Sequence, residues 1–158
     1  LECEKLYAEV DGERADIGHV GEIVKVNDEL LEHLTNDEYI PVVAPIGTDK
    51  NGNNYNINAD SAAGAIACAL KAEKLMLLTD VDGVKDAGGN VIFEINTPTV
   101  RKLINDGIID GGMIPKALGC VKAINSGVKR VHIIDGRIPH SILLEIFTDE
   151  GIGTMITK

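Results

Sequence analysis

Short apolar strands alternate with helix-forming segments in the second half of the chain, and this alternation restricts the fold more than any other feature. Residues 74–79 and 130–135 are runs rich in Leu, Ile and Val, which is typical of buried strands. Helical patterns at 97–105 and 115–125 separate the two runs. Strands that alternate with helices pair in parallel through right-handed crossovers. The sequence therefore predicts an α/β fold with a largely parallel sheet, and its 158 residues predict a single domain.

Turn and cap residues predict the elements at the start of the chain. The dipeptide Asp11-Gly12 suits the type I′ turn of a hairpin over residues 5–26. Asn27 can cap a short amphipathic helix that ends at Leu34. We therefore expect a hairpin followed directly by a helix.

The remaining elements are predicted from apolar runs and turn residues. The run YIPVVAPI at 39–46 predicts a buried strand, and the polar cluster at 50–54 predicts the tip of a second hairpin. Small residues at 60–72 predict a helix that packs closely on a sheet. We also expect an edge strand at 91–93, a helix at 141–147 and a last strand at 154–156.

The charge of the chain argues against a nucleic-acid-binding protein. The net charge is −10, and residues 1–40 contain 12 acidic and 3 basic residues. An acidic chain repels phosphate groups, and the absence of Trp leaves few side chains on which bases could stack. We expect no nucleic-acid partner, and we interpret the acidic first quarter as a solvated face.

Apolar runs and cysteines predict a cytoplasmic protein. The longest apolar runs, such as residues 75–78, are far shorter than the ~20 residues that cross a bilayer. The chain does not open with the basic and apolar regions of a secretory signal. Cys3, Cys68 and Cys120 are widely spaced and form no CxxC motif. We therefore expect reduced thiols, no metal site and no membrane segment.

Three segments lie where open α/β sheets bind ligands, beyond predicted strands. These segments are 56–60, 79–84 and 110–116. Asp60 can cap the helix that follows it, or it can orient lysine side chains around a phosphoryl group. Asn56 can be a turn residue or can bind a substrate carboxylate. Asp80 and Asp82 can form turns, or they can face a nucleotide ribose or a metal ion. The residues alone leave these alternatives open.

The segment at 110–116 gives the clearest chemical indication. Gly111 and Gly112 carry no Cβ, so their backbone N–H groups can approach a ligand closely. Pro115 suits the first turn of a helix, whose N-terminus carries partial positive charge, and Lys116 adds a full charge beside it. This pattern favours an anion site, with phosphate as the anion. A tight loop with an exposed lysine would have the same pattern.

Four runs of sequence taken together resemble the N-acetylglutamate kinases of the amino acid kinase family. The runs are YNINADSAAGAIACAL (55–70), LLTDVDGV (77–84), DGGMIPK (110–116) and KRVHIIDGRIPHSILLEIFTDEGIGTMI (129–156). The resemblance extends in order from about Asp16 to the end. It implies a three-layer αβα sandwich with a mainly parallel central sheet. Enzymes of this family are nearly twice as long, so the resemblance implies that residues 1–158 are the C-terminal ATP-binding half and that the N-terminal substrate half is absent.

The resemblance also implies a reaction and the residues that perform it. The γ-phosphoryl group of ATP would pass to the side-chain carboxylate of N-acetyl-L-glutamate in arginine biosynthesis, with Mg²⁺ bridging the phosphates. Lys116 and Asp60 would be catalytic, and Asn56 would bind N-acetyl-L-glutamate. The residues implied to line the nucleotide are Asp80, Val81, Asp82, Gly83, Val84, Lys85, Ile108, Ile109, Asp110, Gly111, Gly112 and Met113.

The family resemblance carries two further expectations. His132, Glu145 and Gly151 resemble positions at which arginine inhibits many acetylglutamate kinases, although a histidine within a strand is more often structural. The full-length protein is expected to be a homo-oligomer, and this chain alone is expected to be inactive. Alternatives are a relative such as glutamate 5-kinase or carbamate kinase, or a non-catalytic arginine-sensing module.

Overall fold

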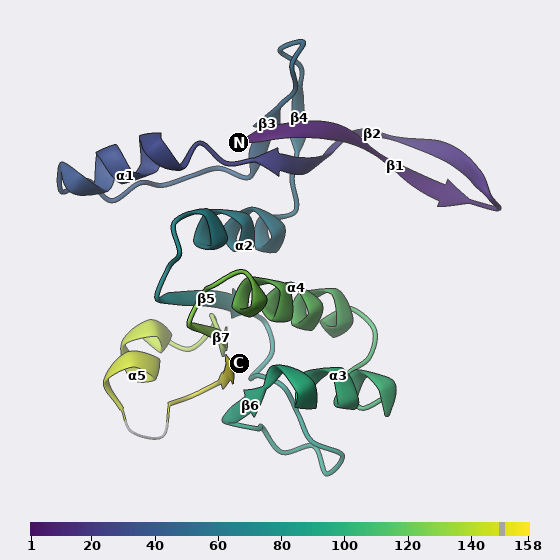
Figure 1. The fold of residues 1–158 in the computed structure, drawn as a ribbon. Coiled ribbons are helices and arrows are strands. Elements are labelled where there is room, and N and C mark those ends of the chain that lie inside the picture. The colour runs from purple at the N-terminus through teal and green to yellow at the C-terminus, as the bar shows by residue number, and fades with distance from the viewer. Residues whose placement is uncertain (149–150) are drawn as a thin grey trace. The chain divides into compact units, whose positions relative to one another are not determined.

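The computed structural model describes residues 1–148 and 151–158, and it divides the chain into two compact units (Figure 1). Unit 1 is Leu1–Leu70 and unit 2 is Lys71–Lys158. Each unit combines a sheet with helices, so the predicted α/β class is confirmed. Whether the two units behave as a single domain stays a prediction.

Unit 1 is a hairpin, a helix, a second hairpin and a second helix. Its elements are β1 (Glu2–Val10), β2 (Glu13–Lys25), α1 (Asp28–Asn36), β3 (Ile46–Thr48), β4 (Asn54–Asn56) and α2 (Ala59–Ala69). The strands pair in the closed order β1-β2-β4-β3. Asp11 and Gly12 have φ values of 55° and 81°. A type I′ turn requires positive φ at both central residues, so the predicted first hairpin is confirmed.

The predicted cap of α1 is also present. The side chain of Asn27 accepts a hydrogen bond from the backbone N–H of Leu30 at 3.1 Å. This bond satisfies one of the N–H groups that a helix leaves unpaired at its start. The helix continues to Asn36, two residues beyond its predicted end at Leu34.

The prediction of a buried strand at 39–46 is wrong. Ile40 is 90% exposed and Val42 is 95% exposed, and β3 begins only at Ile46. Pro41 and Pro45 have no backbone N–H to donate to a ladder. The apolar sequence indicates burial, but unit 1 supplies no surface that covers these side chains in the described part of the chain.

The core of unit 1 is small and lies where its strands meet α2. Cys3, Tyr55, Ile57 and Ala62 are buried together, with Leu1 and Ile23 packed against them. A Cβ placed on Gly47 would lie 2.7 Å from the Cys3 sulfur, so the backbone of β3 reaches the core at this glycine.

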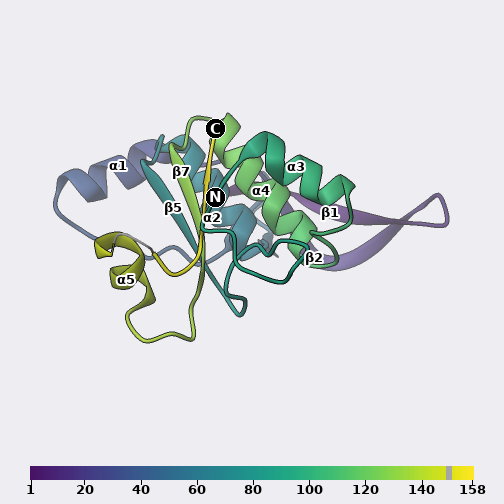
Figure 2. The same cartoon turned by 90° about the horizontal axis from the view of Figure 1, so that it is seen from below.

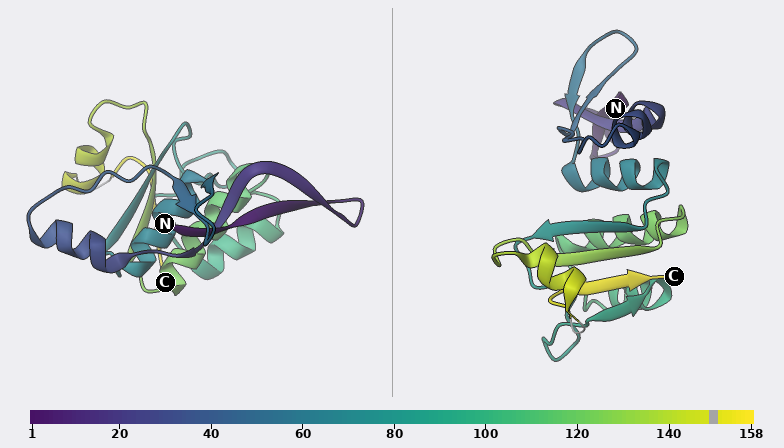
Figure 3. Two further views of the ribbon diagram at one scale, coloured as in Figure 1. Left: turned by 90° about the horizontal axis from the view of Figure 1, so that it is seen from above. Right: turned by 90° about the vertical axis from the view of Figure 1, so that its left-hand side faces the viewer.

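Unit 2 contains a four-stranded sheet covered on both faces. Its elements are β5 (Lys74–Thr79), β6 (Glu94–Asn96), α3 (Thr97–Asn105), α4 (Met113–Asn125), β7 (Arg130–Asp135), α5 (Ser141–Phe147) and β8 (Thr154–Thr157). The strand order is β5-β7-β8-β6, with β5–β7 and β6–β8 parallel and β7–β8 antiparallel. Helices α3 and α4 cover one face and α5 covers the other (Figures 2 and 3). Within this unit, three layers and a mainly parallel sheet match the prediction.

The core of unit 2 is centred on β7. Val131, Ile133 and Ile134 have no exposed surface, and neither has Ile156 of β8. Burial of five of the six residues of β7 explains why this strand reads as a continuous apolar run.

Three elements of unit 2 differ in their bounds from the predictions, and the smallest difference is that β8 ends at Thr157 rather than at residue 156. The edge strand is β6 at 94–96 rather than 91–93, because residues 94–96 are the ones in register with β8, while Val91 forms an isolated bridge with Lys85. Helix α4 begins at Met113, so Pro115 occupies the third position of the first turn.

No helix in residues 1–148 and 151–158 has both the length and the apolar character to cross a membrane.

Candidate functional site

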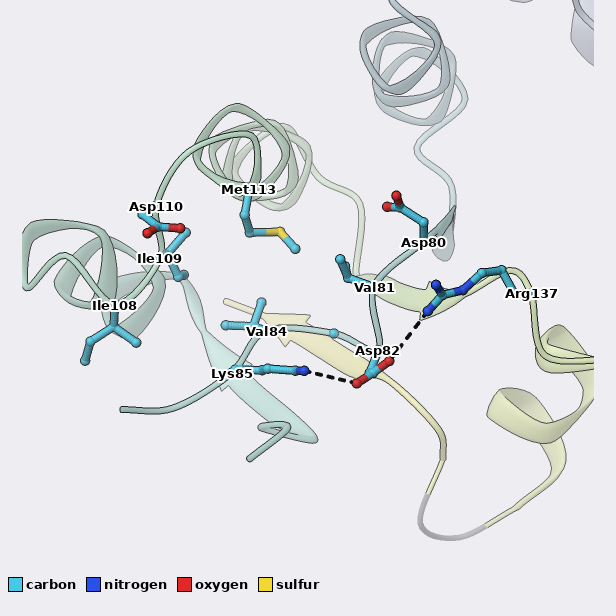
Figure 4. Close-up of a pocket in the computed structure, with 11 residues that line it drawn as sticks. Asp80, Val81, Asp82, Val84, Lys85, Ile108, Ile109, Asp110, Met113 and Arg137 are labelled. Atoms are coloured by element: carbon cyan, nitrogen blue, oxygen red, sulfur yellow. Dashed lines mark ion pairs between the residues drawn. The ribbon is translucent and has the colours of Figure 1, made fainter. Parts of the chain in front are cut away.

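A cavity of about 390 Å³ lies in unit 2 beyond the C-terminal end of β5 (Figure 4). The residues that line it are Asp80, Val81, Asp82, Gly83, Val84, Lys85, Ile108, Ile109, Asp110, Met113 and Arg137. Ten of these belong to the twelve residues that the sequence predicts for nucleotide binding. The structure therefore brings together two predicted segments that are separated by more than twenty positions in the chain.

One wall of the cavity is the loop that follows β5, residues 80–85. Val84 is 1% exposed, and its carbonyl accepts a hydrogen bond from the backbone N–H of Ile92 at 2.8 Å. Lys85 pairs with Val91 in an isolated bridge. These contacts fix the end of the loop, so that the residues before it form a defined wall.

The opposite wall comes from the segment that leads into α4. Figure 4 shows Ile109, Asp110 and Met113 across the cavity from the 80–85 loop. Gly111 has φ +49°, a conformation that favours glycine, and Gly112 is the N-cap residue of α4. The two glycines do not line the cavity but join two residues that do, Asp110 and Met113.

Arg137 also lines the cavity, although it is not among the residues predicted for the site. It lies two residues beyond β7, and Asp135 at the end of β7 is in register with Thr79 at the end of β5. Parallel strands end at the same edge of a sheet, where ligands bind. The position of Arg137 just after a predicted strand could therefore have placed it in the site.

The two cationic groups of the cavity, Lys85 and Arg137, are linked through Asp82. Its carboxylate lies 3.1 Å from the Lys85 ammonium and 3.9 Å from the Arg137 guanidinium (Figure 4). Arg137 also donates from Nη2 to Asp135 at 2.7 Å and from Nε at 2.9 Å. This guanidinium lowers the pKa of Asp135 to about 2. Asp135 therefore stays ionised at neutral pH and fixes Arg137 at the edge of the cavity.

The residues implied to be catalytic occur in both units. Lys116 is half-buried in the first turn of α4 in unit 2. Asp60 is half-buried in the first turn of α2, and Asn56 is the exposed last residue of β4, both in unit 1. The N-cap of α2 is Asn58, whose side chain accepts from the N–H of Ser61 at 3.0 Å. The alternative in which Asp60 caps this helix is therefore wrong.

The three residues of the expected arginine site lie together in unit 2. His132 Nδ1 is 2.7 Å from Glu145 Oε1, and both side chains are buried. Gly151 has φ +65°, and a Cβ there would lie 2.8 Å from Glu145 Oε2. Among the described residues, His132 Nε2 is a buried atom without a hydrogen-bond partner. A buried ring nitrogen without a partner is compatible with an arginine site and with a structural role for His132. Both alternatives therefore stay open.

The acidic residues of the cavity do not form a metal centre by themselves. In residues 1–148 and 151–158, no group of three or more His, Cys, Asp or Glu side chains could hold a metal ion. Asp82 is also paired with two cationic groups. A divalent cation in this cavity would need most of its ligands from a bound molecule.

Comparison with known proteins places the chain within one family. The amino acid kinase family matches residues 4–135. An acetylglutamate kinase from Caldicellulosiruptor saccharolyticus is 58% identical over 158 residues, which is 99% of this chain and 54% of that protein. The chain thus spans about half the length of the curated relatives it matches.

Solved structures support the fold. A crystal structure of N-acetylglutamate synthase from Neisseria gonorrhoeae, complexed with coenzyme A and L-arginine, has a TM-score of 0.89 and 29% identity. The matched region covers 100% of this chain and 36% of the synthase chain. Carbamate kinase from Giardia lamblia, bound to AMP-PNP, has a TM-score of 0.69 and 20% identity, with coverage of 98% and 52%. At 20% identity, the similarity to carbamate kinase is evidence for the fold alone.

Proposed function

The chain belongs to the amino acid kinase family, and we propose that it is the nucleotide-binding half of an acetylglutamate kinase. The full-length enzyme would transfer the γ-phosphoryl group of ATP to the side-chain carboxylate of N-acetyl-L-glutamate. The observation that carries this proposal is the 58% identity to an acetylglutamate kinase along 99% of the chain. The missing half of the enzyme would supply further substrate-binding and charge-compensating groups.

The 80–85 loop and the 108–113 segment would hold the nucleotide. The cavity between them has a volume of about 390 Å³, within the usual range for small-molecule sites. Its walls combine apolar side chains such as Val81 and Met113 with charged groups at the rim. Arg137, which lies at this rim, would contact an anionic part of the nucleotide.

Phosphoryl transfer requires little covalent help from the protein but extensive charge compensation. A carboxylate oxygen of N-acetylglutamate would attack the γ-phosphorus, and the bond to the β–γ bridging oxygen would break, so that ADP leaves with the electron pair. Lys116 would neutralise charge on the phosphoryl oxygens in the transition state. Asp60 would hold lysine ammonium groups in place, and Asn56 would bind the acetylglutamate.

Mg²⁺ would enter with ATP and reduce the repulsion between the phosphates and the attacking carboxylate. Because the described residues form no metal cluster, the phosphates and water would supply most of its ligands.

Arginine would inhibit the full-length enzyme through the cluster of His132, Glu145 and Gly151. The observation that supports this second role is His132 Nε2, a buried polar atom that has no hydrogen-bond partner among the described residues. We also propose that the full-length protein is a cytoplasmic homo-oligomer.

The proposal is tested by the substrate dependence of ADP release. The full-length protein is expected to release ADP from ATP when N-acetyl-L-glutamate is added, and not when glutamate or carbamate replaces it. Release with glutamate or carbamate alone would identify a glutamate 5-kinase or a carbamate kinase and would reject the proposal. A thermal-shift series with ATP, acetylglutamate and arginine gives a second readout, because a ligand that binds the native state raises its melting temperature.

A further inference from the structure

The 80–85 loop is attached through its backbone to a strand seventy residues away. The N–H of Val84 donates to Thr154 Oγ1 at 2.8 Å. Val84 is 1% exposed and Thr154 is fully buried. A backbone N–H in such a position must find an acceptor, because an unpaired buried donor costs much of its hydration energy.

The preceding residue of the loop lies directly against the same hydroxyl group. A Cβ built on Gly83 would be 2.6 Å from Thr154 Oγ1 and 3.2 Å from the Thr154 nitrogen. The φ of Gly83 is +148°, a value that L side chains rarely adopt. The loop therefore reaches Thr154 closely because glycine is present, and the hydrogen bond to Val84 follows one residue later.

Thr154 is itself held firmly. It pairs with Ile133 in the centre of the sheet. The residues before it are fixed by Glu145, whose Oε2 accepts from the N–H of Ile152 at 2.7 Å and of Gly153 at 3.2 Å. The hydroxyl group of Thr154 therefore has a defined position. A group can position another segment only if it is itself held in place.

We propose that Thr154 is a positioning residue that fixes the 80–85 loop in the conformation that binds nucleotide. The inference rests on the proposed function, since it takes the cavity to be the ATP site. Thr154 does not line the cavity. It acts through Val84 and Gly83, which do, and the carbonyl of Val84 is held separately by Ile92. The hydroxyl of Thr154 is therefore the contact that ties the loop to β8.

The test is Thr154→Val in the full-length protein, because valine keeps the shape of threonine and removes the acceptor. The backbone N–H of Val84 then has no acceptor at residue 154. The 80–85 loop must move away from β8 for this N–H to reach another acceptor. Nucleotide binding has to restore the original conformation, so KM for ATP is expected to rise about tenfold. The turnover at saturating ATP and KM for acetylglutamate are expected to stay near wild type.

Two companion variants separate positioning from general destabilisation. Thr154→Ser keeps the oxygen and is expected to restore the wild-type KM for ATP. Thr157→Val makes the same change at the end of the same strand and is expected to leave KM for ATP unchanged. A lower melting temperature with an unchanged KM for ATP in Thr154→Val would show a merely structural threonine and overturn the proposal. So would a Thr154→Ser variant as weak as Thr154→Val.

A second approach covers the case in which Thr154→Val fails to fold. Gly83→Ala places a methyl group against Thr154 Oγ1 from the side of the loop, and it is expected to raise KM for ATP as well. An unchanged KM in folded Gly83→Ala would overturn the proposal. Failure of the proposed function is a separate result, because it would appear as wild-type protein that neither binds ATP nor phosphorylates acetylglutamate.

Discussion

Units 1 and 2 contain similar kinds of elements but bury their apolar residues to different extents. In unit 2, Ile133 and Ile134 of β7 are fully buried between two layers of helices. In unit 1, Ile40 and Val42 are almost fully exposed, although they lie in the apolar run at 39–46. The central strand of unit 2 is therefore covered by its own unit, whereas the 39–46 run of unit 1 is left uncovered by the described residues. The contrast concerns these two segments, because α5 of unit 2 also exposes Leu143 and Phe147. This contrast fits the proposal that the chain is half of a longer kinase.

The activity of residues 1–158 by themselves tests whether the two units suffice for catalysis. We expect purified residues 1–158 to show no acetylglutamate-dependent ADP release, because the charge-compensating groups of the missing half would be absent. The full-length protein assayed in parallel is the control. Robust turnover by the chain alone would mean that unit 1, despite its uncovered surface, completes a working site.

Lys116 tests the contribution of unit 2 to catalysis. In the full-length protein, Lys116→Ala is expected to lower kcat by ~10²–10³-fold, as loss of one group that stabilises transition-state charge commonly does. ATP binding should weaken far less, because the interaction strengthens in the transition state. Lys122→Ala, in the last turn of the same helix, is the matched control. A near-normal kcat for Lys116→Ala would contradict a catalytic role and would indicate an ordinary surface lysine.

Asp60 tests the contribution of unit 1. Asn58 rather than Asp60 caps α2, so Asp60→Asn should leave the helix and the melting temperature nearly unchanged. The change removes the negative charge that would hold lysine ammonium groups near the phosphates, and displacement of a positioning group by about 1 Å can reduce the rate ~10²-fold. Asp28→Asn makes the same change in the first turn of α1 and serves as the control. Unchanged turnover of folded Asp60→Asn would contradict a catalytic role.

Substitutions at one buried and one exposed apolar residue measure how much burial stabilises each unit. In the 158-residue chain, Ile133→Ala is expected to lower the free energy of unfolding by about 2–5 kcal/mol, because it leaves a cavity in a fully packed strand. Val42→Ser should change it by less than about 0.5 kcal/mol, because Val42 is 95% exposed. Urea denaturation of the two variants measures both values. A comparable loss in Val42→Ser would show that this side chain is buried in solution.

The same contrast explains which parts of the structure the sequence predicts. In unit 2, β5, α3, β7 and α5 have the predicted bounds. For β7 the reason is burial, because other parts of the same unit cover five of its six residues. Helix α5 forms as predicted although Leu143 and Phe147 are exposed. The run at 39–46 has an equally clear pattern but lacks a covering surface, so the predicted strand does not form. Apolar residues thus predict a strand most securely where other parts of the same chain cover it, as in β7.

The candidate site was predictable where local sequence carries the chemistry. Ten cavity residues come from two short segments, 80–85 and 108–113, which the family resemblance assigns to nucleotide binding. Arg137 and Thr154 could not be found in this way. The first reaches the cavity because β7 is in register with β5, and the second reaches Val84 because β8 lies in the same sheet. Both depend on pairing between distant segments, which the local pattern does not specify.

Each unit contains one carboxylate whose pKa is lowered, and the causes differ. Asp49 and Asp135 each have a pKa lowered to about 2. For Asp49 the main cause is a hydrogen bond from the neutral side chain of Asn53, and for Asp135 it is the charged guanidinium of Arg137. Because both folded-state values lie below the ordinary 3.8, each group stabilises the native state above about pH 4. That contribution is lost as the pH falls toward 2.

The difference in cause predicts a difference in salt dependence, which carboxyl NMR titration can measure. Added salt screens the guanidinium, so the pKa of Asp135 should rise with ionic strength, whereas that of Asp49 should change less because its donors are uncharged. Arg137→Gln should raise the pKa of Asp135 toward 3.8 and leave Asp49 unaffected. Equal salt dependence at the two residues would contradict this assignment of causes. In that case the neutral backbone donor of Arg137, which bonds Asp135 at 2.9 Å, would dominate its pKa.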